Sequence, residues 1–323
     1  MTLRIGMLST ARINANLAAG ARASARTRVA AIASRQLARA EAQARELGVE
    51  KAHGSYEALL ADPEIDAVYV SLPNEMHHEW AMHAIAAGKH VLCEKPYSRS
   101  PAEVQTAFAA AEAAGVVLAE AFMWRHHPQA LKLSEVVAGG SIGQIRLVRA
   151  AFSFPLDDPR DVRLLEELDG GGLMDVGCYC VSAARMLAGD PVSVTAQQLR
   201  APSGVDRRLV ATLAHGGDVL AHFDCALDLA NRSDLEVVGS EGALRVSDPW
   251  HSRKTGIELV RDDGHGEHFD IPAADPYACE LDDLAGAIAG EHAPRLGMDD
   301  ALGQARTIQA LYASASSGRR VEL

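Results

Sequence analysis

The chain has 323 residues, of which 48% are apolar and 23% are charged, a balance typical of globular proteins with a buried core. Its 31 basic and 43 acidic side chains give a formal net charge of −12, and no basic patch is interleaved with aromatic residues, so we expect no nucleic-acid partner. No apolar run approaches the roughly 18 residues of a membrane-spanning helix, so we expect no membrane partner either.

The first 120 residues alternate between two kinds of segment. Short β-branched or continuously apolar runs, typical of buried parallel strands, occupy 3–8, 29–34, 66–72, 89–95 and 116–122. Alanine-rich stretches with helical periodicity lie between them, at 11–24, 35–47, 75–88 and 100–115. This alternation predicts an α/β fold, a doubly wound parallel sheet of the Rossmann type, over residues 1–121.

The pattern changes from residue 122 onward. We expect a helix over 127–140, a strand over 145–154 and a glycine-led helix over 170–189. Strands then follow one another without helices between them, at 191–200, 208–216, 218–227, 234–240, 242–247 and 256–261, before two helices at 276–290 and 299–318. Successive strands separated by turn signals predict a large, mostly antiparallel sheet, so residues 122–323 are expected to form an α+β domain.

The turn after the first strand carries the first candidate site. In the sequence IGMLSTARIN, over 5–14, the three glycine positions of a G-x-G-x-x-G fingerprint are held by Ser9, Ala11 and Asn14. Ser9 and Ala11 are small enough to let a pyrophosphate approach the backbone if their φ angles are negative, and the hydroxyls of Ser9 and Thr10 could donate to phosphate oxygens. The stretch alone is compatible with dinucleotide binding and with a plain strand-to-helix joint.

The end of the second strand reads Ala33-Ser34-Arg35. A protein that reads the ribose 2′-hydroxyl of NAD needs an acid here, whereas one that accepts a 2′-phosphate needs arginine and small hydroxyls. The absence of an acid favours NADP over NAD if the fold binds a dinucleotide. Otherwise Arg35 merely opens a surface helix.

The third strand ends in LPNEMHH. Because ligands of open parallel sheets lie beyond the carboxyl ends of the strands, Leu72, Pro73, Asn74 and His77 are placed where a cofactor would pass. The alternative is a strand exit followed by a helix cap and a helix surface. His77 and His78 are adjacent rather than spaced as in H-E-x-x-H, so we expect no metal site.

A lysine and a tyrosine with an aspartate complete the candidate chemistry. Glu94-Lys95-Pro96 follows the fourth strand, and Asp175 and Tyr179 are four residues apart, so they share a face of one helix. A tyrosine has an ordinary pKa of about 10, and an adjacent ammonium brings its phenolate within reach at neutral pH. The alternatives are a solvated loop lysine, a half-buried core tyrosine and an acid that stabilises a helix start.

Together these motifs resemble the Gfo/Idh/MocA oxidoreductase family, in the branch with glucose-fructose oxidoreductase, dimeric dihydrodiol dehydrogenase and NADP-dependent D-xylose dehydrogenase. The resemblance rests on LPN-x-x-H at 72–77, EKP at 94–96 and GGGLMDVGCY at 170–179, and it covers essentially the whole chain. It implies a dinucleotide-binding domain over 1–121 and a substrate-binding domain over 122–323, whose open sheet builds homodimers or homotetramers.

The resemblance also implies the site residues. Lys95 and Tyr179 would be the catalytic pair, with Asp175 in support. We expect cofactor contacts from Ser9, Thr10, Ala11, Arg12, Ile13, Ser34, Arg35, Leu72, Pro73, Asn74, His77, Glu94, Lys95, Trp124 and Arg125. We expect substrate contacts from Lys95, Trp124, Phe154, Arg163, Asp175 and Tyr179. Asp161 stands where the branch often has asparagine two residues before Arg163, which leaves the identity of the sugar open.

These expectations define an NADP-dependent dehydrogenase, with NAD as a second candidate cofactor, that oxidises C1 of an aldose to a lactone. The alternatives are a trans-dihydrodiol or dicarbonyl reductase of the same fold, and a non-catalytic NADP-sensing protein, against which the retained Lys95 and Tyr179 argue. The five cysteines form no C-x-x-C pair and the N-terminus lacks a secretory pattern, so a cytoplasmic protein with reduced thiols is expected.

Overall fold

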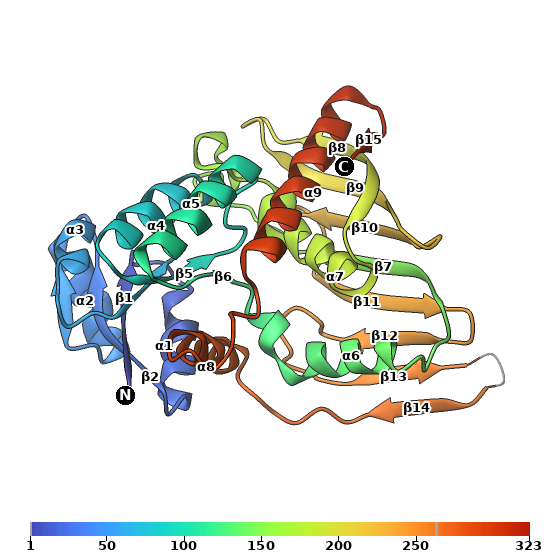
Figure 1. Ribbon diagram of the computed structural model, residues 1–323. Helices are drawn as coiled ribbons and strands as arrows, with labels where there is room; N and C mark the ends of the chain where they lie inside the picture. The colour runs from blue at the N-terminus through green and yellow to red at the C-terminus, as the bar shows by residue number, and fades with distance from the viewer. Residues whose placement is uncertain (1, 262–263) are drawn as a thin grey trace. The chain divides into compact units, whose positions relative to one another are not determined.

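The computed structural model describes residues 2–261 and 264–323 (Figure 1). The chain folds into two compact units. The first takes in the chain up to His126 and also Ala274–Leu302, and the second comprises His127–Ala273 and Gly303–Leu323. The expected boundary between residues 121 and 122 lies close to this division. Residues 274–302, however, were assigned to the second domain from the sequence and belong to the first unit.

The described residues of the first unit contain six strands in one parallel sheet, as the sequence pattern predicts. The strand order is β3-β2-β1-β4-β5-β6, which is the doubly wound arrangement. The strands are β1 (Leu3–Leu8), β2 (Thr27–Ala33), β3 (Lys51–His53), β4 (Ala67–Val70), β5 (His90–Glu94) and β6 (Leu118–Ala121). The short strand β3 has no counterpart among the expected elements, because three residues carry no readable periodicity.

In the described part of the first unit, helices lie between these strands, and a further helix comes from the later segment Ala274–Leu302. They are α1 (Asn14–Ala23), α2 (Leu37–Leu47), α3 (Tyr56–Leu60), α4 (His77–Ala86), α5 (Pro101–Ala114) and α8 (Pro276–Ile288), with the short 3₁₀ turns η1 (Asn74–Met76) and η2 (Met123–His126). Helix α5 shows why the boundaries follow the sequence. Ser100 accepts a hydrogen bond from the main-chain N–H of Glu103, Pro101 fixes the first turn, and Gly115 ends the helix with a φ of 67°.

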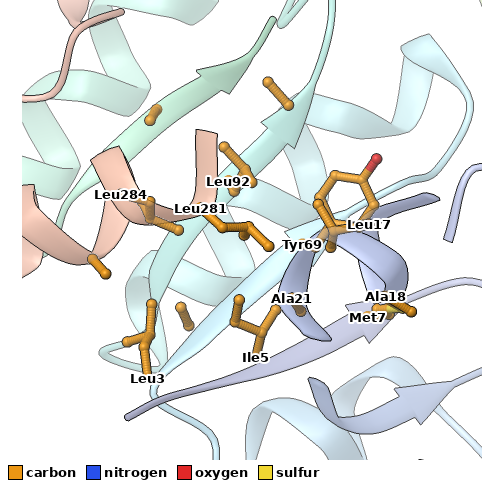
Figure 2. Packing of buried hydrophobic residues seen from close by; sticks show 14 of the residues in the cluster. Leu3, Ile5, Met7, Leu17, Ala18, Ala21, Tyr69, Leu92, Leu281 and Leu284 are labelled. Carbon is orange, nitrogen blue, oxygen red and sulfur yellow. The ribbon is translucent and has the colours of Figure 1, made fainter. Parts of the chain in front are cut away.

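Helices α1 and α8 lie against each other and help to cover the same side of the sheet, opposite α4 and α5 (Figure 1). Buried side chains of β1, α1 and α8 form one apolar cluster, in which Ile5, Leu17 and Leu281 are almost inaccessible to solvent (Figure 2). Burial of a leucine side chain stabilises a fold by roughly 1.5–3 kcal/mol. The burial of Leu281 and Leu284 in this cluster therefore stabilises the packing of α8 in the first unit.

The close approach of these two helices requires a glycine. A Cβ atom added at Gly20 of α1 would lie 2.6 Å from Cβ of Tyr277 and 2.8 Å from the main-chain nitrogen of Ala278. The side chain of Asn16 also donates a hydrogen bond to the Tyr277 hydroxyl, at 3.4 Å. The start of α8 is therefore fitted to α1, next to the turn that follows β1.

In the second unit, nine strands of the described residues form a sheet of order β14-β13-β12-β11-β7-β10-β9-β8-β15. All of its pairs are antiparallel except β7 with β10. The strands are β7 (Ile145–Ser153), β8 (Pro191–Arg200), β9 (Asp206–His215), β10 (Leu220–Ala226), β11 (Arg232–Gly239), β12 (Ala243–Ser247), β13 (Ile257–Val260), β14 (Gly266–Phe269) and β15 (Val321–Glu322). The large, mostly antiparallel sheet predicted from the sequence is thus confirmed.

Helices α6 (Pro128–Ala138) and α7 (Cys178–Ala188) accompany one face of this sheet (Figure 1). The glycine-led helix expected over 170–189 begins as a π-helical segment, η5 (Leu173–Gly177), before it continues as α7. Single π-helical turns are rare in proteins, and those that occur are often found at functional sites. This one contains Asp175. Helix α9 (Met298–Ser317) precedes the last strand.

The structure also bears on the other compositional expectations. Each of the five cysteines is free, and burial raises the pKa of the thiols of Cys93, Cys180 and Cys225 well above their ordinary value. Among the described residues, no helix is both long and apolar enough to cross a membrane. Within 2–261 and 264–323, no group of three or more His, Cys, Asp or Glu side chains is arranged to hold a metal ion.

Candidate functional site

The turn after β1 keeps a glycine-like geometry at a serine. Ser9 holds the first glycine position of the fingerprint and has a φ of 143°, a conformation that side-chain-bearing residues rarely adopt. The expectation that this residue works with a negative φ is therefore wrong. The hydroxyl of Ser9 accepts a hydrogen bond from the main-chain N–H of Ala11 at 3.0 Å and lies 2.8 Å from the hydroxyl of Ser71. Because it is buried in these contacts, it does not point outward to a phosphate as we had expected.

Asn14, at the third glycine position, locks this turn from inside. Its side-chain nitrogen donates to the carbonyl of Ser9 and to the side chain of Gln43, both at 2.9 Å. Its side-chain oxygen accepts from the hydroxyl of Ser71 at 2.7 Å. Asn14 is fully buried, so the residue at the third glycine position stabilises the strained serine.

The N-terminus of α1 remains accessible beside this turn. No side chain caps the helix, and Thr10 to Ile13 are at least partly exposed to solvent. The N–H groups of Asn14, Ala15 and Asn16 already donate to carbonyls of the preceding turn at 2.9–3.3 Å, so this helix start would attract a phosphate through the positive end of its dipole. The helix start, rather than the buried hydroxyl of Ser9, therefore has the character of an anion-binding site, and the phosphate contact expected of the Thr10 hydroxyl stays a prediction.

Two arginines lie at the end of β2. Arg35 is exposed directly after the buried Ser34, and α2 adds Arg39 one turn later. Burial raises the pKa of the Tyr56 hydroxyl, while the nearby guanidinium groups of Arg35 and Arg39 oppose this shift, so both positive charges face the same ring. Arg39 was missed in the sequence, although its i, i+4 spacing from Arg35 was a readable signal.

His77 has a different environment from the expected one. Its ring is 1% exposed, with Nδ1 3.0 Å from the carbonyl oxygen of Pro96 and Nε2 2.8 Å from that of Leu72. Burial lowers its pKa to about 4, although the two carbonyls oppose the shift. A neutral imidazole can donate from only one of its two nitrogens, so His77 donates to one of these carbonyls while lying between the loops after β4 and β5, and its expected cofactor contact stays a prediction.

The lysine of the EKP motif lies beside a carboxylate that is itself held in place. The hydroxyl of Tyr69 donates a short hydrogen bond to Glu94, and the main-chain N–H of Lys95 contacts the other oxygen of the same carboxylate at 3.2 Å. The peptide bond between Lys95 and Pro96 is cis. Lys95 is partly buried and directly follows β5, at the carboxyl edge of the parallel sheet.

The Trp-Arg pair lies in η2 of the first unit. Trp124 is 1% exposed, and the guanidinium of Arg125 lies 5.8 Å from the centre of its indole ring, at the distance of a cation–π contact. Arg125 also forms an ion pair with Asp300, with 3.3 Å between Nη1 and Oδ1. The guanidinium is therefore held by two partners within its own unit.

In the second unit, an arginine is clamped between two aspartates. Nε of Arg163 lies 2.9 Å from Oδ2 of Asp175, and its Nη1 lies 3.2 Å from Oδ1 of Asp161. These carboxylates raise the pKa of Arg163, Asp175 having the largest effect. The ion pair with Arg163 fixes the orientation of the Asp175 carboxylate, which lies one helical turn before Tyr179.

The ring of Tyr179 packs against the rings of Phe152 and Trp250, which together are called the aromatic wall. Its ring meets Phe152 edge-to-face at 5.3 Å and lies 5.9 Å from Trp250, and the Trp250 indole N–H donates to the carbonyl of Ala151 at 3.0 Å. Phe152 makes the contact with Tyr179, and the substrate contact expected of Phe154 stays a prediction. Phe152 and Trp250 were missed in the sequence, because Trp250 comes from a loop far away along the chain.

The expected catalytic set is thus divided between the two units. Lys95 and the cofactor-edge residues belong to the first unit, and Asp175 and Tyr179 belong to the second. The structure brings Asp175, Arg163 and the aromatic wall together within one unit. The pairing of Lys95 with Tyr179 stays a prediction from the sequence.

Comparison with known proteins relates both units to one family. The model described as an oxidoreductase family with an NAD-binding Rossmann fold, GFO_IDH_MocA, matches residues 3–122, and the GFO/IDH/MocA C-terminal domain matches residues 130–245. The D-xylose 1-dehydrogenase (NADP(+)) 2 of Haloferax volcanii is 39% identical over 326 residues, which cover 99% of this chain and 100% of that protein.

Two solved structures share the architecture of the whole chain. The aldose-aldose oxidoreductase of Caulobacter crescentus, complexed with glycerol, has a TM-score of 0.92 at 26% identity and covers 100% of both chains. The 3-ketoreductase KijD10 of Actinomadura kijaniata, complexed with NADP and TDP-benzene, has a TM-score of 0.91 at 32% identity and covers 97% of this chain and 98% of that one.

Proposed function

The chain belongs to the GFO/IDH/MocA oxidoreductase family, and we propose that it is an NADP-dependent enzyme that oxidises C1 of an aldose to a lactone. The observation that carries this proposal is the set of groups beside Tyr179. The tyrosine has an aromatic wall on one side and a clamped aspartate one turn away, which suits a hydroxyl-bearing ring. The relatives named for D-xylose and aldose oxidoreduction support a sugar substrate.

The choice of NADP rests on the end of β2. Arg35 and Arg39 provide two guanidinium groups near the hydroxyl of Tyr56, and the hydroxyl of the buried Ser34 accepts the main-chain N–H of Gln36 at 3.4 Å. Such a set fits a 2′-phosphate, because arginine forms strong charge-assisted hydrogen bonds with phosphate oxygens. The uncapped start of α1 fits the pyrophosphate. NADP in the KijD10 complex and in the name of the Haloferax relative supports the same choice.

The protein's own residues manage the proton in this reaction. NADP, when bound, supplies the nicotinamide C4 that accepts the hydride from C1 of the sugar. Tyr179 takes the proton of the C1 hydroxyl, and the ammonium of Lys95 lowers the free energy of the phenolate that results from its own proton loss. Asp175, held by Arg163, orients the sugar hydroxyl. The sugar loses one hydride and one proton, and the product is a lactone.

A trans-dihydrodiol or dicarbonyl reductase is the second candidate. It is favoured by Phe152 and Trp250, because an apolar or aromatic substrate would gain contact area on the same wall. Sugars also stack on aromatic rings, so the wall alone does not separate the two substrate classes. The charged cluster of Arg163 favours a polyhydroxylated substrate over an apolar one.

We further propose that the open face of the second unit's sheet pairs with a second copy of the chain. This face carries exposed apolar side chains, Val210 and Leu220, beside a row of alternating charges. In that row Glu236 accepts from Arg149 at 2.7 Å and from Arg245 at 3.1 Å. A row of alternating charges is self-complementary across a two-fold axis. Sedimentation analysis of the Leu220→Glu variant, expected to be monomeric, tests this pairing.

The experiment that tests the proposed reaction follows NADP and NAD reduction in parallel over a panel of aldoses, inositols, dihydrodiols and dicarbonyl compounds. We expect turnover with an aldose and NADP. Turnover confined to dihydrodiols or dicarbonyls supports the second candidate. NADP binding without turnover on any member of the panel contradicts the proposed activity.

A further inference from the structure

A carboxylate is buried beneath the glycine turn that precedes the Tyr179 helix. Asp206, the first residue of β9, is 2% exposed. One of its oxygens accepts the main-chain N–H of Leu173 at 2.7 Å, and the other accepts the hydroxyl of Tyr312 at 2.8 Å. Leu173 is the first residue of η5, so the carboxylate satisfies a free N–H at the start of the segment that carries Asp175 and leads to Tyr179.

The glycines of this turn fit closely around the carboxylate. Gly171 has a φ of 127°, and a Cβ atom added there would lie 2.1 Å from Oδ1 of Asp206. Its N–H donates to the carbonyl of Arg163 at 2.8 Å, and its carbonyl accepts the N–H of Asp175 at 3.0 Å. Asp206 is therefore linked to Asp175 and to Arg163, whose side chain clamps Asp175, through one glycine.

The surroundings of Asp206 place its change of charge in the physiological range. Burial raises its pKa to about 6, although the hydrogen bonds from Tyr312 and Leu173 oppose the shift. The groups that face it from neighbouring strands are Arg200, which also lowers its pKa, and the buried thiol of Cys225. The carboxyl group is thus charged at neutral pH and becomes neutral when the pH falls below about 6.

Protonation changes what this carboxyl group can do. An ionised carboxylate accepts hydrogen bonds at both oxygens, whereas a carboxylic acid must donate from one of them. Its bond to the Leu173 N–H also loses the charge assistance that makes such bonds strong, and the positive end of the helix loses its counter-charge. The start of η5 is then held less firmly, and with it the positions of Asp175 and Tyr179.

We propose that Asp206 is a positioning residue whose ionised form holds the Asp175–Tyr179 segment in its active geometry, and whose protonation sets the acid limit of activity. This inference rests on the proposed function, because it takes Tyr179 as the group that accepts the substrate proton. It assigns no contact with substrate to Asp206, which acts through Gly171 and Leu173.

The pH dependence of kcat and KM tests the proposal between about pH 5 and pH 8. We expect kcat of the wild type to fall on the acid side of about 6, where Asp206 becomes protonated. Asp206→Asn should lower kcat more than it raises KM, and its acid limb should lose the component near pH 6, because asparagine does not titrate, and keep only the part that comes from protonation of Tyr179 itself. Tyr312→Phe removes a hydrogen bond that lowers the pKa, so its acid limb should move to higher pH.

A matched control separates positioning from loss of stability. Asp62 is also buried, but it lies in the first unit, where it pairs with Lys51 at 3.1 Å. Asp62→Asn should lower the melting temperature and leave the acid limb in place. If Asp206→Asn also keeps the wild-type acid limb, or if Tyr312→Phe leaves it unmoved, Asp206 is a structural cap only and the proposal is overturned.

A second readout does not need turnover. In protein labelled with ¹³C-tyrosine, the Tyr179 ring signal, assigned with Tyr179→Phe, should shift with a midpoint near pH 6, and this component should vanish in Asp206→Asn. Ring contacts that do not involve Asp206, such as that of His251 with Phe152, remain in both proteins and cancel in the comparison. Identical titrations of the Tyr179 signal in both proteins contradict the positioning role, even if no substrate is found. If Asp206→Asn loses the component near pH 6 but no substrate is turned over, the positioning role stands and the result counts against the proposed reaction.

Discussion

The sharpest prediction concerns the backbone at Ser9. Ser9→Ala and Ser9→Gly remove the same hydroxyl and its hydrogen bonds to Ser71 and Ala11. They differ only in the Cβ atom, which at a φ of 143° is strained by about 1–3 kcal/mol. At an ordinary position glycine is instead the less stable residue by about 0.4–1 kcal/mol, because it has more freedom in the unfolded chain. We therefore expect Ser9→Gly to be more stable than Ser9→Ala by about 1–2 kcal/mol.

Urea unfolding followed by circular dichroism measures this difference, with NADP affinity as a second readout. Ser71 supplies the matched control, because it takes part in the same hydroxyl pair but is not among the residues with a positive φ. At Ser71 the order should reverse, with alanine more stable than glycine. If Ser9→Ala proves as stable as Ser9→Gly, the glycine-like turn does not exist and the explanation for the missing fingerprint fails.

Three further predictions follow from the first unit. Gly20→Ala should destabilise the protein by about 1–3 kcal/mol in urea unfolding, since its Cβ meets Tyr277, and a stabilised variant would contradict the α1–α8 packing. Burial lowers the pKa of His77 to about 4, whereas the unfolded chain binds the proton with a pKa of about 6.5. The free energy of unfolding should therefore decrease by up to about 1.4 kcal/mol per pH unit as the pH falls from about 6.5 to 4. His77→Gln should lose that slope in thermal scans, and an unchanged slope would count against the buried neutral ring. The double variant Arg35→Ala with Arg39→Ala should bind NADP at least tenfold more weakly and NAD nearly as before by fluorescence titration, and equal losses for both would refute the 2′-phosphate role.

The sequence predicted the sheets well because their signals are local. Continuous apolar runs such as that of β4 can be stable only when both faces are covered, so the alternation with helices determines the parallel order. The strands after α7 follow one another through short turns, and their antiparallel pairing was equally readable. The position of α8 was not readable, because the choice between two apolar cores depends on Leu281 joining the same buried cluster as Ile5, which is far away in the chain.

The site was predictable by residue type and less so by orientation. Ser9, Asn14 and His77 stand where the motif analysis placed them, but hydrogen bonds to Ser71 and Pro96 turn their polar atoms inward. Such partners come from neighbouring strands and loops, and no local pattern identifies them. Asp206 could not be identified from the sequence for the same reason. Its contact with the glycine turn, more than thirty residues earlier in the chain, depends on how β9 packs.

The most direct test of the proposed chemistry is the single-turnover rate of Tyr179→Phe with NADP and the best aldose of the panel. The variant keeps the ring that contacts Phe152 and Trp250 and loses only the hydroxyl that would take the proton. We expect the rate of NADP reduction to fall by roughly 10²–10⁴-fold while the NADP dissociation constant stays within about threefold of the wild type. An unchanged rate would contradict the assignment of Tyr179 as the group that accepts the sugar proton.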